Sequence, residues 1–284
     1  MLYNAGITQQ IGARISMSLN YYHRDYYRII ATQNTLVPPS SFATSYTPIL
    51  IANPLTGGAL TIYNLNPALL GRTLLEDSNS PNDRRTYNDV DLTFNARFPN
   101  GATFLGGAST GKLHAISCDI TSANVNAAAD NYDPNALYGC DDNEPWRTSV
   151  KLTASYPLPG GFKVSGVFQS LPGLIETRTA NNNGDFPVNL VVTKALVPNL
   201  TQSSLVVRLN QPGTQFLDRD NQVDLSLTKN FKVGRTQLKP VVDLFNVFNV
   251  APVTNASGTF GTSLLQPITV LPGRLLRFGA RLEF

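Results

Sequence analysis

Alternation of apolar and polar residues recurs along this chain, and the spacing of the alternating segments constrains the fold more than any other feature. In the segment 84–98, for example, Val90, Leu92 and Phe94 take every second position, and polar residues lie between them. Successive side chains of a strand point to opposite faces, so such a segment predicts a β-strand with one apolar face. The pattern predicts nine strands, near 3–11, 14–30, 84–98, 102–117, 146–158, 162–178, 219–232, 236–250 and 273–284.

Short and long connections alternate strictly between these strands. Tight turns are expected around 12–13, 99–101, 159–161 and 233–235. The other four connections are long and rich in Asn, Pro, Thr, Ser and Gly. All the turns therefore fall at one end of the sheet and all the long loops at the other, as in outer-membrane barrels with short periplasmic turns and long extracellular loops. The fold class expected is all-β: a partial antiparallel transmembrane β-barrel of about nine strands.

Composition narrows the alternatives. Charged residues make up 14% of the 284 residues, against roughly 25% in ordinary soluble domains. No stretch approaches the ~18 consecutive apolar residues of a membrane helix, and no run of Lys or Arg suggests a nucleic-acid partner. A soluble all-β binding domain stays possible on composition alone, but it would expose the apolar strand faces to water.

The sequence after Met1 has no basic region, apolar core or cleavage site typical of a secretory leader. Either the chain is intracellular or its true beginning is missing. Single-chain bacterial barrels have an even number of strands, so nine strands indicate the C-terminal portion of a larger barrel. If the first strand is not formed, eight strands could close as a small barrel.

The last strand ends on an aromatic residue. It places five apolar residues on one face, and they are Leu276, Phe278, Ala280, Leu282 and Phe284. This ending resembles the terminal strand of bacterial outer-membrane proteins, and the resemblance implies that these residues form the signal for the barrel assembly machinery. Any amphipathic edge strand would alternate in the same way.

Longer blocks resemble a particular family. The block LKPVVDLFNVFNVAPV followed by LPGRLLRFGARLEF is similar to the closing strands of TonB-dependent outer-membrane receptors. The segments YPLPGGFKVSGVFQSLPG and NDRRTYNDVDLTFNARFPNGA resemble the Oar-like branch, whose members carry a carboxypeptidase regulatory-like domain and a plug. On this resemblance, residues 1–284 are the C-terminal part of the receptor barrel. No TonB box, plug or regulatory-like domain is recognised in the sequence.

The resemblance implies a receptor of the bacterial outer membrane that takes up a ligand bound at its outer loops. The implied partners are outer-membrane lipid, the barrel assembly machinery, the rest of the receptor, an unknown extracellular ligand and, only through the plug, the TonB complex. The alternative is a small complete outer-membrane channel or adhesin. No catalytic motif, metal site or cofactor fingerprint is found, so we expect neither an enzyme nor a cofactor.

Few residues are candidates for a specific role. Cys118 and Cys140 fall in one long loop and are expected to form a disulfide, because the outer surface is oxidising. Closing a loop of this size stabilises by ~3 kcal/mol in the chain-entropy model. Nearby carboxylates could bind Ca²⁺ but lack the spacing of a loop motif, so a solvated loop is favoured. The candidates for facing the barrel lumen are Asp89, Asp91, Arg97 and Asp224.

Overall fold

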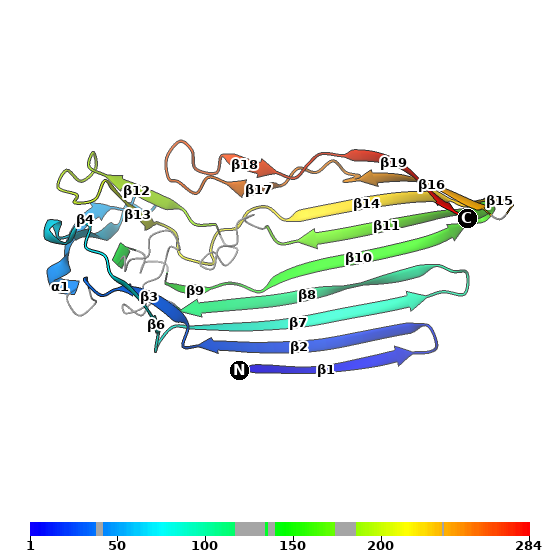
Figure 1. The fold of residues 1–284 in the computed structure, drawn as a ribbon, viewed down its shortest axis with the longest axis horizontal. Coiled ribbons are helices and arrows are strands. Elements are labelled where there is room, and N and C mark those ends of the chain that lie inside the picture. Colours follow the sequence, from blue (N-terminus) through cyan, green and yellow to red (C-terminus); the bar gives the residue numbers. More distant parts are fainter. Residues whose placement is uncertain (38–41, 117–133, 136–139, 174–185, 235) are drawn as a thin grey trace.

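The computed structural model describes residues 1–37, 42–116, 134–135, 140–173, 186–234 and 236–284, and their fold is all-β. Nine long strands lie side by side in one antiparallel sheet (Figure 1). They are β1 (Leu2–Ile11), β2 (Ile15–Tyr27), β7 (Arg84–Arg97), β8 (Thr103–Ile116), β10 (Arg147–Leu158), β11 (Phe162–Leu171), β14 (Asp220–Lys229), β16 (Thr236–Phe245) and β19 (Leu275–Glu283). The nine strands predicted from the sequence are confirmed.

Each long strand pairs with its neighbours in sequence order, from β1 through β16 to β19. Tight turns join the strands at one end, and glycines with positive φ lie in all four of them; Gly12 has φ 64° and Gly101 has φ 82°. These are values that L side chains adopt rarely. The long connections all lie at the other end (Figure 1). The asymmetry predicted from the sequence is therefore present in the fold.

Three strands end earlier than predicted, each for a local reason. The strand β2 ends at Tyr27 because Arg28 takes a positive φ of 54°. The strand β11 ends at Leu171, directly before a proline that has no N–H to donate to the sheet. The strand β16 ends at Phe245 because Asn246 takes φ 50°, a left-handed conformation that Asn tolerates. A fourth predicted strand, 219–232, is divided into β14 and β15 (Phe231–Val233).

In the long sheet the apolar side chains are exposed and the polar ones are partly buried, which is the reverse of the arrangement in a soluble protein. On β14, Leu225 and Leu227 are each 42% exposed, whereas Ser226 between them is partly buried. On β2, Ile15, Met17 and Leu19 are exposed and the serines between them are partly buried. We call the side of the sheet that bears Leu19, Leu92, Leu152, Leu225 and Val242 the apolar face, and the opposite side the polar face.

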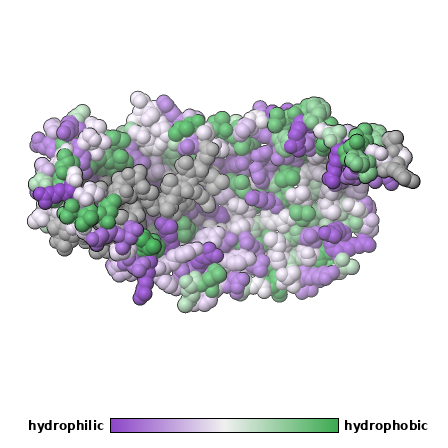
Figure 2. All heavy atoms as spheres, in the orientation of Figure 1, coloured by the Kyte–Doolittle hydropathy of each residue, from purple (hydrophilic) through white to green (hydrophobic). Residues whose placement is uncertain are grey.

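The accessible surface area is larger than that of a compact globular protein of the same length. It measures 16569 Å², whereas a compact soluble chain of this length exposes about 12,000 Å². The face of the strand region that Figure 2 shows carries many hydrophilic side chains between hydrophobic ones. A single layer of strands leaves both of its faces exposed, and this accounts for the excess. No helix in the described ranges is long and apolar enough to span a membrane.

The long connections fold together into a unit that the sequence did not predict. Their described parts, within 28–83, 134–135, 186–219 and 246–274, are called the loop cap here. The cap contains four antiparallel strand pairs and a short helix, α1 (Phe42–Ser45). The pairs join β3 (Ile30–Asn34) with β6 (Leu75–Asn79), β4 (Tyr46–Ala52) with β5 (Ala59–Leu65), β12 (Asn189–Thr193) with β13 (Ser204–Arg208), and β17 (Val253–Ala256) with β18 (Pro267–Val270). The short strand β9 (Asp141–Asn143) extends the long sheet beside β8.

A hydrophobic core holds the loop cap together. Ile62 of β5, Val192 of β12 and Phe186 pack in one buried cluster, although they come from two different connections. Ala256 brings a third connection into the same cluster. In the described part of the long sheet, by contrast, few apolar side chains are fully buried. The loop cap therefore has the only extended conventional core among the described residues.

Hydrogen bonds between connections fix the loop cap further. The Asn64 side chain donates to the backbone oxygen of Asn199 at 3.0 Å and accepts from the backbone N–H of Thr201 at 2.8 Å. The buried Asn135 side chain bonds both the N–H and the C=O of Tyr63, at 2.8 and 3.0 Å. All four long connections thus contribute to one packed unit, and the buried amides of Asn64 and Asn135 are paired as burial requires.

Candidate functional site

The four residues predicted to face a lumen lie on the polar face. Asp89, Asp91 and Arg97 occupy alternate positions of β7, and Asp224 lies on β14. In the register, Asp91 is opposite Asn20 of β2 and Ser109 of β8, both polar. The structure does not bring the four into one cluster, because β14 lies several strands away from β7 in the sheet.

Asp89 is the most buried of these groups, at 7% exposed. The Ser109 hydroxyl donates to both of its carboxylate oxygens at 3.0 Å, and Tyr87 also hydrogen-bonds to it. Gly111 makes room for this arrangement, because a Cβ there would lie 2.7 Å from the Tyr87 hydroxyl. The Tyr87 ring therefore lies against Gly111, and its hydroxyl is held by the Asp89 carboxylate.

Asp224 has a different role. It accepts from the backbone N–H of Asn246 at 2.7 Å and from the Gln222 side chain at 2.8 Å. The Asn246 side chain in turn donates to the carbonyl oxygens of Val250 and Pro272, at 2.7 and 3.0 Å. Asp224 thus anchors the turn through which the chain leaves β16 for the loop cap.

The terminal strand β19 is attached to β16 by ion pairs on the polar face. Arg277 lies 2.8 Å from Asp243, and Lys239 lies 2.6 Å from Glu283. The five predicted assembly-signal residues, Leu276, Phe278, Ala280, Leu282 and Phe284, are all exposed, and Phe284 is 100% exposed. Charged pairs therefore lie on one side of this strand and a bare apolar row on the other. The signalling role of that row stays a prediction.

Most residues of the predicted acidic loop lie outside the described ranges, including Cys118, Asp119, Asp130 and Asp133. Cys140 is disulfide-bonded, and Cys118 is the chain's only other cysteine. Asp141 pairs with His114 of the neighbouring strand at 2.7 Å. No group of His, Cys, Asp and Glu in the described part of the chain is arranged to hold a metal ion. The predicted calcium-binding alternative gains no support from the residues that are described.

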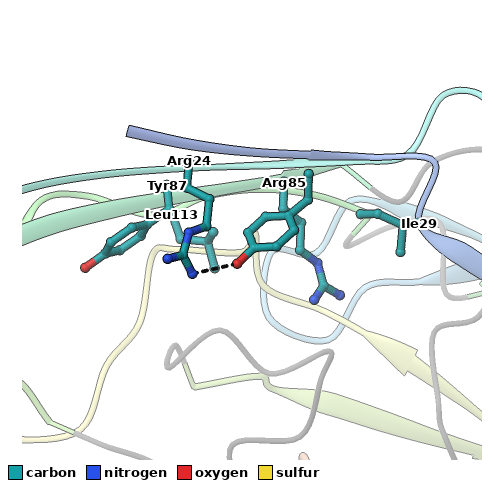
Figure 3. A pocket seen from close by; sticks show the side chains of 6 residues that line it. Arg24, Ile29, Arg85, Tyr87 and Leu113 are labelled. Carbon is teal, nitrogen blue, oxygen red and sulfur yellow. Dashed lines mark hydrogen bonds between the residues drawn. The ribbon is translucent and has the colours of Figure 1, made fainter. Parts of the chain in front are cut away.

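An open cleft of about 360 Å³ lies on the polar face at the loop end of β2, β7 and β8. Its lining includes two arginines and two tyrosines, which project from the same side of the strands (Figure 3). The lining residues are Arg24, Tyr26, Ile29, Arg85, Tyr87 and Leu113. Sequence reasoning did not bring these residues together in one site. The signal was present in the motifs RDYY and RRTY, which place Arg and Tyr at the same parity near two strand ends.

The turn end of the sheet carries a basic and aromatic group of a different kind. The Lys229 ammonium lies 3.9 Å from the centre of the Phe162 ring and 5.2 Å from that of Phe231. It also donates to the carbonyl oxygen of Gly160 at 2.6 Å. A lysine can bury its aliphatic stem along apolar surface while its ammonium group stays in water or over an aromatic ring.

Comparison with known proteins gives a match to a solved structure. No protein-family model matches the sequence, and no curated protein matches it. The chain superposes on the crystal structure of the outer membrane transporter YddB from Escherichia coli with a TM-score of 0.47 and 13% sequence identity. The superposition covers 98% of this chain and 32% of that chain, so the chain spans less than half of the transporter's length.

Proposed function

We propose that this chain forms part of the wall of an outer-membrane β-barrel that serves as a transport receptor. One observation carries the proposal: nine long antiparallel strands present an exposed apolar face and a partly buried polar face. Transmembrane barrels alternate in this way, with apolar residues toward lipid and polar residues toward the lumen. In water the same apolar face would favour aggregation.

The two ends of the sheet give the proposed wall a direction. The tight turns would face the periplasm, as in bacterial barrels, and the loop cap would face outward. Lys229 and its aromatic neighbours would then lie at the periplasmic boundary of the bilayer, where amphipathic side chains are favoured. The loop cap, with its own core, would offer an ordered surface for an extracellular ligand.

The edges of the sheet support a barrel with more strands than these nine. Within the described residues, β1 pairs only with β2, and β19 pairs only with β16. In lipid each unpaired backbone group costs several kcal/mol, so both edges need partners. The alternative small barrel has eight strands, lacks the first strand and would need β2 to pair with β19, but in the structure β1 is formed and pairs with β2 over its whole length. The pairing pattern therefore favours completion of the wall by further strands of a larger receptor.

The finer part of the proposal is that this receptor is TonB-dependent and Oar-like. The resemblance of 236–250 and 273–284 to the closing strands of such receptors supports it. Ligand would bind at the loop cap and pass along the polar face, and energy would reach the receptor through a plug contributed by the rest of the protein. This chain would supply wall, outer surface and assembly signal.

Produced by itself, the chain is expected to give no closed barrel, because the outer edges of β1 and β19 pair with no strand among the described residues. Refolded in detergent, it should show the circular dichroism of β-sheet but no shift in electrophoretic mobility on heating. It should also give no pore conductance in planar bilayers. The readouts are gel mobility with and without boiling, and single-channel recording.

The control is the full receptor of which we propose that this chain is a part, called the parent protein here. In isolated outer membranes the parent protein should run as a heat-modifiable band. A closed, conducting barrel formed by residues 1–284 alone would contradict the larger-barrel proposal and favour the small channel. Recovery of the parent protein in the soluble fraction would contradict the membrane proposal as a whole.

A further inference from the structure

In the cleft at the loop end of the polar face, each arginine of one strand lies opposite a tyrosine of the next. In the register of β2 with β7, Arg24 lies opposite Tyr87, and Tyr26 lies opposite Arg85. The two arginines are therefore diagonal neighbours, a relation that separates strand positions by about 7–8 Å. Their long side chains can reach one bound group from two directions. Figure 3 shows Arg24, Arg85 and Tyr87 on one side of the strands.

Two contacts order this arrangement before any ligand arrives. The Arg24 guanidinium donates to the Tyr26 hydroxyl at 2.8 Å, and its Cζ lies 5.8 Å from the centre of the Tyr26 ring. Tyr87 is held by Asp89 and by its position over Gly111. Ordering the binding groups in advance lowers the entropy that a ligand loses on binding.

Two carboxylates on these strands already accept hydrogen bonds from other residues. Asp89, the next polar-face residue along β7 from Tyr87, accepts from Ser109 and Tyr87. On the opposite face, Asp25 accepts from Thr86 at 2.7 Å and lies 2.8 Å from the His23 ring nitrogen. The Arg24 guanidinium lines the cleft, where it donates to the Tyr26 hydroxyl.

The cleft also has an apolar side. Ile29 and Leu113 line it together with the two tyrosine rings, and Leu113 lies opposite Tyr87 in the register of β7 with β8. Two guanidinium groups beside aromatic and aliphatic surface suit a molecule that has an anionic group on an apolar body. A planar guanidinium matches a carboxylate or phosphate with two parallel hydrogen bonds.

We infer that this cleft binds an organic anion, a carboxylate or phosphate carried on an aromatic or aliphatic body. The anionic group lies between Arg24 and Arg85, and the body packs on Tyr26, Tyr87 and Leu113. The inference rests on the proposed function, since the cleft opens to the lumen only if the sheet is part of a barrel wall. The inference deepens the proposed function, because it names the chemical class of the molecule that the polar face binds at the end next to the loop cap.

The test is calorimetric titration of the detergent-solubilised parent protein with phenyl phosphate and, separately, with benzoate. Saturable binding is expected for at least one of these probes, weaker binding for inorganic phosphate and none for phenol. Arg24→Gln and Arg85→Gln should each weaken binding about tenfold, because each removes a charge-assisted hydrogen bond to the anion. Arg84→Gln is the matched control. Arg84 is adjacent to Arg85 in sequence but lies opposite Tyr27, on the other side of the sheet. The affinity of the Arg84→Gln variant for the probe should differ less than twofold from that of the wild type.

Binding of neither probe, or equal weakening by Arg84→Gln, would overturn the inference. Equal affinity for phenol and phenyl phosphate would also overturn it, because the anionic group would then contribute nothing. Heat-modifiable mobility of the same samples tests the proposed function separately. A protein that keeps its membrane-barrel mobility but binds no probe refutes the cleft alone, and one that binds the probe without that mobility refutes the barrel alone.

Discussion

Replacing Phe186 with alanine is expected to destabilise the loop cap by about 3–5 kcal/mol, the usual cost of removing a fully buried phenylalanine. Phe186 is 2% exposed and lies in the cluster with Val188 and Leu209. Its backbone N–H also donates to the carbonyl oxygen of Gln215 at 2.6 Å. Truncation would leave a cavity where several connections meet. Limited proteolysis of the membrane-inserted protein, followed as a function of urea, measures the effect.

The matched control is Phe248→Ala. Phe248 belongs to the same loop cap but is 68% exposed, so its loss should change stability by less than about 0.5 kcal/mol. Both variants should keep the mobility of the barrel, because neither residue lies in a long strand. Equal protease resistance of Phe186→Ala and the wild type would show that the connections do not share a core.

Replacing Leu225 with arginine is expected to cost about 2–4 kcal/mol if its side chain faces the middle of the bilayer. Leu225 lies near the centre of β14, on the apolar face, opposite Gly166 of β11 and Leu244 of β16. A guanidinium there would be placed in hydrocarbon without a charged partner. Equilibrium unfolding in urea from lipid vesicles measures the cost, and the amount of folded protein in outer membranes should fall with it.

Ser226→Arg is the control, because Ser226 is the next residue and points to the polar face. There the new side chain would lie beside Asp243, with which Ser226 already hydrogen-bonds. We expect a change below about 1 kcal/mol, because the polar face is only partly buried and the new guanidinium lies beside a carboxylate. A larger loss for Ser226→Arg than for Leu225→Arg would mean that the two faces have been assigned in the wrong sense.

The long strands could be predicted because their signal is local. Each strand alternates within its own sequence, as Val223 to Thr228 does, and each tight turn contains a glycine where the backbone needs a positive φ. The predicted strands extend too far at some ends, because single residues end those strands in the structure. Arg28 and Asn246 take left-handed conformations, and no periodicity indicates this in advance.

The loop cap could not be predicted because its core forms between segments far apart in sequence. The stretch 59–65 alternates like the long strands, yet Ile62 is buried against Val192, from a different connection. The Asn64 side chain finds its partners at Asn199 and Thr201, more than a hundred residues away. Each stretch is short and amphipathic on its own, and only assembly of the connections determines which side is covered.

The cleft was missed for a related reason. Arg24 and Arg85 are ordinary charged residues near strand ends, and they become neighbours only through the register of β2 with β7. A long connection separates these strands, so turn length does not fix their register as it does in a tight hairpin. The lumen-facing candidates were easier to identify, because the parity of a single strand assigns Asp89, Asp91 and Arg97 to one face.

The central claim is that the apolar face of the sheet contacts lipid, and collision measurements on nitroxide labels test it most directly. Labels are attached to single introduced cysteines at positions 223 to 228 of β14, in the parent protein reconstituted into vesicles. Oxygen, which concentrates in the bilayer, should collide most often with labels at 223, 225 and 227. A water-soluble nickel chelate should collide most often with labels at 224, 226 and 228. Oxygen maxima at the even positions, or no period of two, would contradict the account.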